Sequence, residues 1–272
     1  MKFWKYQGAG NDFVMLDQRT TQWLGRSDQA LIEKLCDRRF GIGGDGLIIL
    51  QDHPEYSFEM IYFNADGRES SMCGNGGRCF AAFAHRLGLV GDYMEFIAID
   101  GPHEAFIRHH PESEGHEGHF WVELKMKNVA QVEQTEDALV LNTGSPHFVR
   151  FVPDVKPLDM FAEGRKVRYS ERFNAEGINV NFAAMQPDGS IAIRTYERGV
   201  EDETLACGTG VTAAVLARHR NLQLAPGAYE VAVQAQGGKL AVRYTADAQG
   251  KFEAIWLCGP ATEVYEGQIS IP

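Results

Sequence analysis

The sequence lacks the features that would place the protein in a membrane or on a nucleic acid. No run of about 18 apolar residues is present, so we expect no membrane-spanning helix. Residues 1–7, MKFWKYQ, lack the apolar stretch of a signal peptide, which predicts a cytoplasmic location. Lysine and arginine are not clustered and the formal net charge is -11, which argues against binding to phosphate backbones. The expected partner is a small molecule.

Cysteine is scarce, and its count is odd. Five cysteines without a secretory signal predict free thiols rather than a framework of disulfides. In other respects the composition is that of a folded globular protein, with 44% hydrophobic and 23% charged residues. A chain of 272 residues is long enough for two lobes with their own cores. The thiols belong to Cys36, Cys73, Cys79, Cys207 and Cys258.

An internal repeat relates the two halves of the chain. A shift of 134 residues, the separation of Cys73 and Cys207, aligns the segments Cys-Gly-Asn-Gly and Cys-Gly-Thr-Gly that begin at these two cysteines. Two copies of this length indicate a duplicated domain, because solenoids repeat every 20 to 50 residues or so. At the same shift Tyr62 matches Tyr196, Glu69 matches Glu203, His85 matches His219, Arg86 matches Arg220, and Gly10-Asn11 falls opposite Gly144-Ser145.

Each copy predicts a strand, a glycine-rich turn that carries the cysteine, a helix and further strands. Residues 59–63 and 191–196 are typical of strands by their alternation and their aromatic or β-branched content. Residues 77–87 and 211–220 are alanine-rich and apolar almost all round, which predicts a helix buried inside each lobe. Each cysteine would then lie at a helix N-terminus. Further strands are expected at 3–6, 13–17, 47–50, 94–99, 119–126, 228–233, 240–244 and 254–257.

The fold class expected from this pattern is α/β (α+β), with two similar lobes and more sheet than helix. The polar stretch 108–118 contains Pro111 and two glycines, so it is a candidate hairpin loop or connection between lobes. The N-terminal lobe would therefore span 1–117 and the C-terminal lobe 118–259.

Two further patterns indicate no functional site. Residues 41–46, GIGGDG, match the dinucleotide fingerprint formally, but that motif needs a strand before it and a helix after it. Here a helical pattern at 28–39 precedes it and the strand 47–50 follows, which predicts a tight helix-to-strand turn. The acidic loop with His109, His110, His116 and His119 offers no framework that would bring its imidazoles onto a metal. Cys36, Cys79 and Cys258 have apolar neighbours, which is typical of buried, inert thiols.

Cys73 and Cys207 differ from the other cysteines because Gly-x-Gly follows each of them at a helix start. A helix N-terminus can lower the pKa of a thiol from about 8.5 to between roughly 3.5 and 7.5. If two such helices face one another across a cleft between the lobes, one thiolate can remove an α-proton and the opposing thiol can protonate the other face. The N-H groups of the turns would hold a carboxylate and stabilise the enolate. The predicted reaction is stereoinversion of an amino acid.

At this point the sequence resembles the diaminopimelate epimerase family, and the resemblance covers the whole chain. It rests on six motifs rather than on the cysteines alone. These are Gly10-Asn11-Asp12-Phe13, Phe63-Asn64-Ala65-Asp66-Gly67, Met72-Cys73-Gly74-Asn75-Gly76-Gly77-Arg78-Cys79, Tyr196-Glu197-Arg198-Gly199, Ala206-Cys207-Gly208-Thr209-Gly210 and Val264-Tyr265-Glu266-Gly267.

The resemblance implies a fold in which each lobe wraps a mainly antiparallel sheet round a central helix, with the tail 260–272 completing the first lobe. It implies epimerisation of LL-2,6-diaminopimelate to the meso form in lysine and peptidoglycan precursor synthesis, without metal or pyridoxal phosphate. Cys73 and Cys207 would be base and acid, assisted by His147 and Glu197. The substrate would be held by backbone N-H groups of Gly74, Asn75, Gly208 and Thr209 and by Asn11, Asn64, Asn179, Glu197 and Arg198.

Two positions depart from the family pattern, which often has Gln where this chain has Gly46 and Asn where it has Ser145. A side-chain contact at position 46 is therefore lost or replaced. The resemblance also implies a homodimer, with Tyr265 at the subunit contact.

Three alternative functions fit the sequence less well. A proline or hydroxyproline racemase also uses paired cysteines, but usually carries His at the position of Asn75, and Glu197-Arg198 suits a substrate with a second charged end. Phenazine-pathway isomerases have an acidic residue in place of the first cysteine. The non-enzyme alternative is a duplicated binding module with structural cysteines, which would show no unusual thiol reactivity.

Overall fold

The computed structural model describes residues 1–108 and 118–271, which form two compact units. Unit 1 comprises Met1–Leu124 and Gly259–Pro272, and unit 2 comprises Lys125–Cys258. The expected hairpin or connection at 108–118 lies almost wholly outside the described residues, as do His109, His110 and His116. Within the described part of the chain, no helix is long and apolar enough to cross a membrane.

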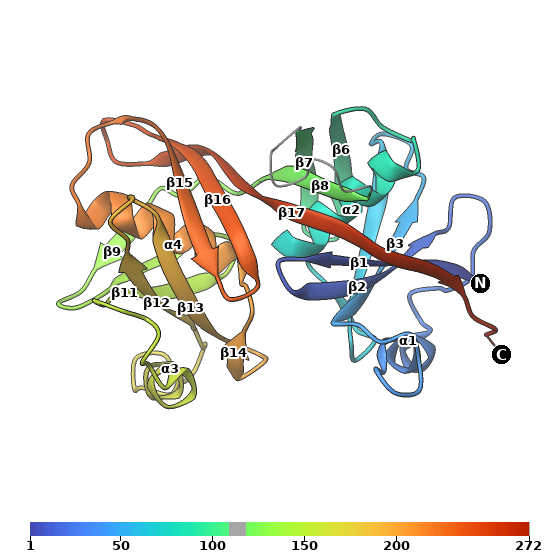
Figure 1. The fold of residues 1–272 in the computed structure, drawn as a ribbon, viewed down its shortest axis with the longest axis horizontal. Helices are drawn as coiled ribbons and strands as arrows, with labels where there is room; N and C mark the ends of the chain where they lie inside the picture. The colour runs from blue at the N-terminus through green and yellow to red at the C-terminus, as the bar shows by residue number, and fades with distance from the viewer. Residues whose placement is uncertain (109–117, 272) are drawn as a thin grey trace. The chain divides into compact units, whose positions relative to one another are not determined.

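Unit 1 is a closed barrel of eight strands (Figure 1). Around the barrel the order is β1, β2, β3, β4, β6, β7, β8 and β17, and β17 pairs with β1 to close it. Closure leaves no unpaired strand edge in this ring. The strands are β1 (Lys2–Gly8), β2 (Asn11–Asp17), β3 (Gly46–Gln51), β4 (Phe58–Asn64), β5 (Glu69–Ser70), β6 (Tyr93–Ala98), β7 (Gly101–Arg108), β8 (His119–Lys125) and β17 (Phe252–Gln268).

Helix α2 (Gly74–Arg86) fills the centre of this barrel, where every residue from Gly74 to Ala84 is buried. It begins three residues earlier than the sequence predicted, because glycines that resemble a turn form its first turn. Their lack of a side chain allows the sheet to approach: a Cβ on Gly76 would lie 3.1 Å from Ile48 Cδ1. The other helix of unit 1, α1 (Gln29–Cys36), lies outside the barrel and precedes the turn 41–46, as the sequence predicted.

Unit 2 repeats the strand pairing of unit 1 around helix α4 (Gly208–Asn221), which is again buried along most of its length. Its sheet runs β9, β10, β11, β12, β13, β15, β16, β17. Its strands are β9 (Val132–Gln134), β10 (Leu139–Asn142), β11 (Pro146–Phe151), β12 (Asn179–Met185), β13 (Ile191–Glu197), β14 (Asp202–Thr204), β15 (Gly227–Ala235) and β16 (Gly238–Ala246).

The two units share one topology, which confirms the duplication inferred from the sequence. In each, an antiparallel pair is followed by a parallel step, an antiparallel step and a second parallel step. The register also corresponds: Phe13 pairs with Gly46 in unit 1, and His147 pairs with Asn179 in unit 2. Phe13 and His147 are 134 residues apart, the shift of the repeat. The fold is thus the expected α+β class.

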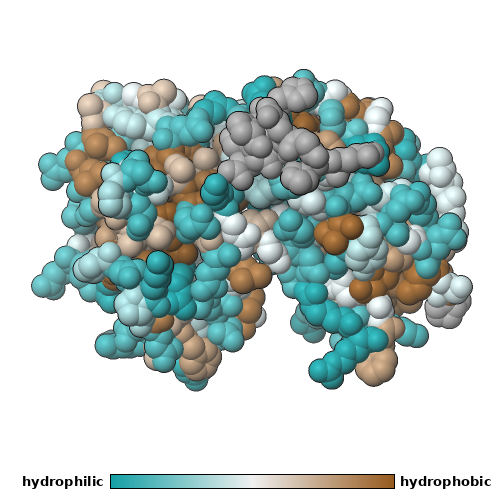
Figure 2. All heavy atoms as spheres, in the orientation of Figure 1, coloured by the Kyte–Doolittle hydropathy of each residue, from teal (hydrophilic) through white to brown (hydrophobic). Residues whose placement is uncertain are grey.

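Unit 2 also contains elements that the sequence did not predict. Helix α3 (Met160–Arg168) is short and polar, and its N-cap Asp159 accepts a hydrogen bond from the Ala162 N-H at 3.0 Å. Strands β9 to β12 were missed, and the strand expected at 254–257 is the middle of β17, which is 17 residues long. On the face drawn in Figure 2, hydrophilic residues separate the exposed apolar residues into several groups.

Candidate active site

The two cysteines of the repeat occupy the same position in their units: each is the N-cap residue of the central helix. Both have extended backbone, with φ and ψ of -87° and 132° at Cys73 and of -109° and 109° at Cys207. Neither first turn contains an acidic residue, so no carboxylate of the helix itself opposes the positive end of its dipole. Each sulfur is therefore next to a helix start that favours the thiolate.

In unit 2 a chain of polar side chains ends at Cys207. The His147 Nε2 lies 2.8 Å from Thr209 Oγ1, which in turn lies 3.5 Å from Cys207 Sγ. On its other side, His147 Nδ1 is 3.1 Å from Asn181 Nδ2. Asn181 is completely buried, and so is His147. The sulfur is thereby connected to a fixed polar network inside the unit.

The hydrogen-bond partners of Asn181 determine the direction of this network. Its Nδ2 donates to the Phe148 carbonyl at 2.9 Å, and its Oδ1 accepts from Thr195 Oγ1 at 2.9 Å. The group that faces His147 is thus an N-H donor, so Nδ1 of the imidazole accepts and Nε2 carries the proton. His147 then donates to Thr209, and the Thr209 hydroxyl is left to donate to Cys207 Sγ. Such a donor stabilises a thiolate over a thiol.

Burial is the main cause that lowers the pKa of His147 to about 3, and the positive charge of the nearby Arg198 lowers it further. This is below the usual histidine value of about 6.5, so the unfolded chain takes up a proton as the pH falls from about 6.5 to 3 while the folded chain does not. The stability that neutral His147 provides is complete above pH 6.5 and decreases through that window.

We predict that the NMR signals of the His147 imidazole do not move between pH 8 and pH 5, because the ring stays neutral. A pH series of two-dimensional spectra measures this, and His147→Asn identifies the signals by their loss. If the signals assigned to His147 in this way titrate with a midpoint above pH 6, the imidazole is not buried and neutral.

Ser145, Asn179 and Arg198 form a second cluster in unit 2. Asn179 Nδ2 donates to Ser145 Oγ at 2.8 Å, and its Oδ1 accepts from the Arg198 backbone N-H at 2.9 Å. The Arg198 guanidinium donates to the Glu176 carbonyl at 3.0 Å and lies 3.5 Å from Ser145 Oγ. Beside it, Glu197 Oε2 accepts from Thr204 Oγ1 at 2.8 Å. The structure thus brings together Asn179 and Arg198, two of the predicted substrate contacts, with Ser145, one of the two positions that depart from the family pattern.

In unit 1 the predicted residues Asn11 and Asn75 are in contact at the start of α2. Asn75 Nδ2 donates to Asn11 Oδ1, and Asn75 Oδ1 accepts from Arg78 at 2.9 Å. Asn11 follows a tight β1–β2 turn formed by Ala9 and Gly10, which have φ of 53° and 92°. Asn64, at the end of β4, is exposed and is not in this network among the described contacts.

Gly46 has no space for a side chain. A Cβ there would lie 2.4 Å from the Phe63 carbonyl oxygen and 2.6 Å from Tyr62 Cε2. The Tyr62 ring packs edge-on against Phe13, with the ring centroids 6.0 Å apart. The space beside position 46 is thus filled by Tyr62.

We predict that Gly46→Ala destabilises the protein by about 1 to 3 kcal/mol, because backbone and a packed ring must move to admit the methyl group. Gly91→Ala is the matched control, since a Cβ at Gly91 meets nothing within 4 Å. Urea unfolding of both variants measures the difference. Equal stability of the two variants would contradict the close packing at position 46.

The remaining cysteines lie away from helix starts. Burial is the main cause that raises the pKa of Cys36 and of Cys79 to about 12, so both thiols stay protonated at neutral pH. Cys258 is 3% exposed. Tyr265 is 46% exposed on β17, edge-on to Phe3. Among the residues that the structure describes, no group of three His, Cys, Asp or Glu side chains could hold a metal ion.

Several residues of these networks were not predicted from the sequence. Asn181 on β12 meets His147 on β11, and Thr195 on β13 meets Asn181, only through the register of these three strands. Asp45 and Arg78 extend the network of Asn11 and Asn75 in unit 1. Polar residues at inward positions of otherwise apolar strands, such as Asn181 in NVNFAAM, were the available signal.

Solved structures share this fold at low sequence identity. A phenazine biosynthesis protein of the PhzF family from Bacillus anthracis superposes with a TM-score of 0.75 at 15% identity, covering 100% of this chain and 99% of its own. A probable proline racemase from Agrobacterium radiobacter gives a TM-score of 0.69 at 14% identity, covering 100% and 93%. The chain therefore has the duplicated fold of this PhzF-family protein and of this probable proline racemase.

Sequence comparison defines the family more narrowly. The sequence pattern of diaminopimelate epimerase matches residues 3–109 and 139–263. A diaminopimelate epimerase from Flavobacterium psychrophilum is 45% identical over 269 residues, which is 99% of this chain and 100% of the relative. One from Aquifex aeolicus is 36% identical over 286 residues, covering 99% and 98%. The chain belongs to the diaminopimelate epimerase family, and hence to the isomerases.

Proposed function

We propose that the protein interconverts LL- and meso-2,6-diaminopimelate, with Cys73 and Cys207 as the acid/base pair. The observation that carries this proposal is the cysteine at the N-cap of the central helix in both units of a chain from this family. Inversion of one carbon requires removal of a proton from one face and delivery to the other. Two thiols at equivalent positions of a duplicated fold supply two equivalent groups for these steps.

The chain's own residues account for the activation of the thiols. At Cys207, the hydroxyl of Thr209 donates toward the sulfur, and its orientation follows from neutral His147. At both cysteines the positive end of the helix dipole favours the thiolate. We propose that His147 and Glu197 assist catalysis.

Backbone N-H groups at both helix starts are suited to the reacting carboxylate. The first N-H groups of an α-helix have no acceptor within the helix, and they attract an anion. We propose that those of Gly74, Asn75, Gly208 and Thr209 bind this carboxylate and stabilise the enolate that forms when the α-proton leaves. This contact needs neither a metal nor pyridoxal phosphate.

The far end of the substrate is assigned to polar side chains of the two units. We propose that Arg198 binds the distal carboxylate, because a guanidinium matches a carboxylate with two hydrogen bonds. Glu197 is adjacent and suits an ammonium group. Asn11, Asn64 and Asn179 complete the proposed set of substrate contacts.

We predict that Arg198→Ala raises KM by about 10- to 30-fold and leaves kcat within about 3-fold, because the lost contact serves ground state and transition state alike. Arg165→Ala is the control, since the Arg165 guanidinium lies over the rings of Phe161 and Tyr169 rather than against Ser145 or Asn179. Steady-state kinetics separates the two constants. A fall in kcat with an unchanged KM would contradict distal binding.

We also propose a cytoplasmic homodimer with Tyr265 at the subunit contact. The half-exposed Tyr265 ring on β17 supports this assignment, because aromatic rings are enriched at protein interfaces. Light scattering of the wild type and of Tyr265→Glu tests it. Two wild-type chains per particle and one chain in the variant are expected, and a wild-type monomer would contradict the proposal.

The activity is tested by incubating the purified chain with LL-diaminopimelate, and separately with L-proline, without added cofactor. Chromatography of chiral derivatives then resolves the stereoisomers. We expect meso-diaminopimelate to form and L-proline to remain unchanged. Inversion of L-proline without inversion of diaminopimelate would instead identify a proline racemase, and inversion of neither would favour the binding module.

A further inference from the structure

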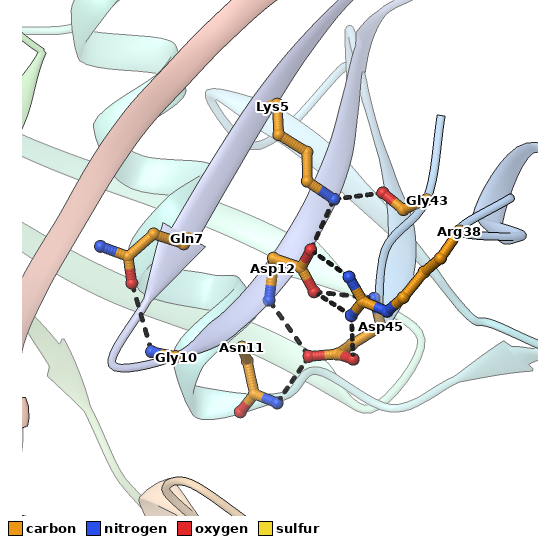
Figure 3. A network of polar contacts seen from close by, with 8 residues as sticks. All are labelled: Lys5, Gln7, Gly10, Asn11, Asp12, Arg38, Gly43 and Asp45. Carbon is orange, nitrogen blue, oxygen red and sulfur yellow. Dashed lines mark hydrogen bonds and ion pairs between the residues drawn. The ribbon is translucent and has the colours of Figure 1, made fainter. Parts of the chain in front are cut away.

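We infer that Asp45 is a positioning residue that fixes the orientation of the Asn11 side-chain amide beside the start of α2, an inference that rests on the proposed function. Asn11 Nδ2 donates to Asp45 Oδ2 at 3.0 Å (Figure 3). The same oxygen accepts the backbone N-H of Asp12 at 3.2 Å, and the other carboxylate oxygen accepts from Arg38 at 2.8 Å. Each of these three partners donates to the carboxylate.

The two ends of this network dictate the orientation of both amides between them. Asp45 is a carboxylate and only accepts hydrogen bonds, whereas the Arg78 guanidinium only donates them. Asn11 must therefore present its NH₂ to Asp45 and its oxygen to Asn75. Asn75 must present its NH₂ to Asn11 and its oxygen to Arg78. A reversal of either amide would place two donors or two acceptors in contact.

Arg78 is fixed from within the barrel. It is completely buried, and it donates to the Gly74 carbonyl at 3.3 Å as well as to Asn75. Because Asn75 and Gly74 directly follow Cys73, the oriented amides lie at the helix start that carries the thiol. The positions of the Asn11 NH₂ and oxygen, which the substrate would contact, are thus fixed before the substrate binds.

The glycine-rich turn 41–46 holds Asp45 in place. The Asp45 N-H donates to the Asp12 carbonyl at 2.8 Å, and the Lys5 ammonium donates to the Gly43 carbonyl. A Cβ on Gly44 would lie 3.1 Å from Lys5 Nζ and 3.2 Å from the Asp12 carbonyl oxygen, so a side chain there would displace these neighbours by a few tenths of an ångström. The turn that resembles a nucleotide motif is therefore a support for Asp45.

The charges around Asp45 balance within the cluster. Asp12 pairs with Lys5 at 2.8 Å and with Arg38 at 2.5 Å, and Arg38 also pairs with Asp45. Burial alone would raise the pKa of Asp12, but the hydrogen bonds from Arg38 and Lys5 outweigh it and hold the pKa well below its usual range. Two carboxylates and two cations thus form a neutral group at neutral pH.

Unit 2 uses a different device at the corresponding position. Ser145 replaces Asn11 in the repeat, and His147 takes the place of Phe13. In unit 2 the imidazole directs the Thr209 hydroxyl, whereas in unit 1 an apolar ring occupies that site and Asp45 directs the amides from the other side. Asn75 and Thr209 correspond, so each network acts on the second residue of its central helix.

Asp45→Asn tests the inference because it preserves shape but not polarity. In one orientation the new NH₂ faces the Arg38 guanidinium, and in the other it faces the Asn11 NH₂ and the Asp12 N-H, so a donor meets a donor in both cases. We expect KM to rise about 10-fold with kcat within about 3-fold, and no further rise when Asp45→Asn is added to Asn11→Ala. Asp137→Asn, which removes an exposed carboxylate paired with Arg150, is the matched control and should leave both constants unchanged.

Multiplicative effects of Asp45→Asn and Asn11→Ala on KM would overturn the inference, since a merely structural carboxylate would act without Asn11. NMR of the wild type provides a readout that needs neither a variant nor an active enzyme. Scalar couplings across hydrogen bonds should connect Asn11 Nδ2 to the Asp45 carboxyl carbon and Asn75 Nδ2 to the Asn11 amide carbon. The reverse connection between the two asparagines would overturn the inference, whereas a wild type without epimerase activity would contradict only the proposed function.

Discussion

Replacement of Cys73 or of Cys207 by alanine is expected to lower kcat for epimerisation by about 10²- to 10⁴-fold. Each substitution removes the group that serves one face of the α-carbon, and a positioned acid or base contributes a factor of this size. The fold should persist because each side chain is small and caps its helix without a side-chain hydrogen bond. Kinetics in both reaction directions, together with thermal unfolding, measure the two effects.

Cys258→Ala is the matched control for the two thiol variants. Cys258 is as buried as a core residue and lies within β17, away from any helix start. Its substitution should leave kcat within about 2-fold, although removal of buried atoms costs some stability. Retention of more than a few per cent of wild-type turnover by folded Cys73→Ala or Cys207→Ala would end the two-thiol mechanism.

Thr209→Val is expected to lower kcat by about 10- to 100-fold, the range seen when a partner that orients a reacting group is removed. Valine has the shape of threonine but cannot transmit the hydrogen bond from His147 to Cys207 Sγ. Loss of the hydroxyl donor disfavours the thiolate, so the limb of the pH profile that reports Cys207 should move to higher pH. Thr209→Ser should restore both kcat and the profile.

Thr212→Val separates this effect from a general change in α4. Thr212 lies on the same helix, is completely buried, and donates to the Gly208 carbonyl at 3.0 Å without contacting the sulfur. The Thr212→Val substitution should leave the pH profile of kcat unchanged. The same displacement in the Thr212 and Thr209 variants would show that the hydroxyl of Thr209 has no special role.

The sequence was sufficient for the central features of the fold because the repeat was preserved at glycines and cysteines. Cys73 and Cys207 could be placed at helix starts, and the shift of 134 residues predicted two units with one topology. The helix bounds were less accurate, since Gly74 and Gly76 have low helix propensity but form the first turn of α2, where the sheet packs closely against Gly76.

The polar networks could not be predicted because they depend on strand register. Asn181 reaches His147 from a neighbouring parallel strand, and Asp45 reaches Asn11 from a turn 34 residues away. Nothing in the local pattern of either segment specifies these contacts. The family resemblance supplied His147 and Asn11 as site residues, whereas the groups that orient them appear only in the structure.

The most direct test of the central claim follows the hydrogen at the inverted carbon. The purified protein is incubated with LL-diaminopimelate in deuterated water, and the meso product is analysed by mass spectrometry during the first few per cent of conversion. Two thiols on opposite faces deliver a solvent-derived hydrogen, so each meso molecule should contain one deuterium, at the inverted α-carbon. Meso product that retains its original hydrogen would show that a single group removes and returns the proton, which contradicts the two-thiol mechanism.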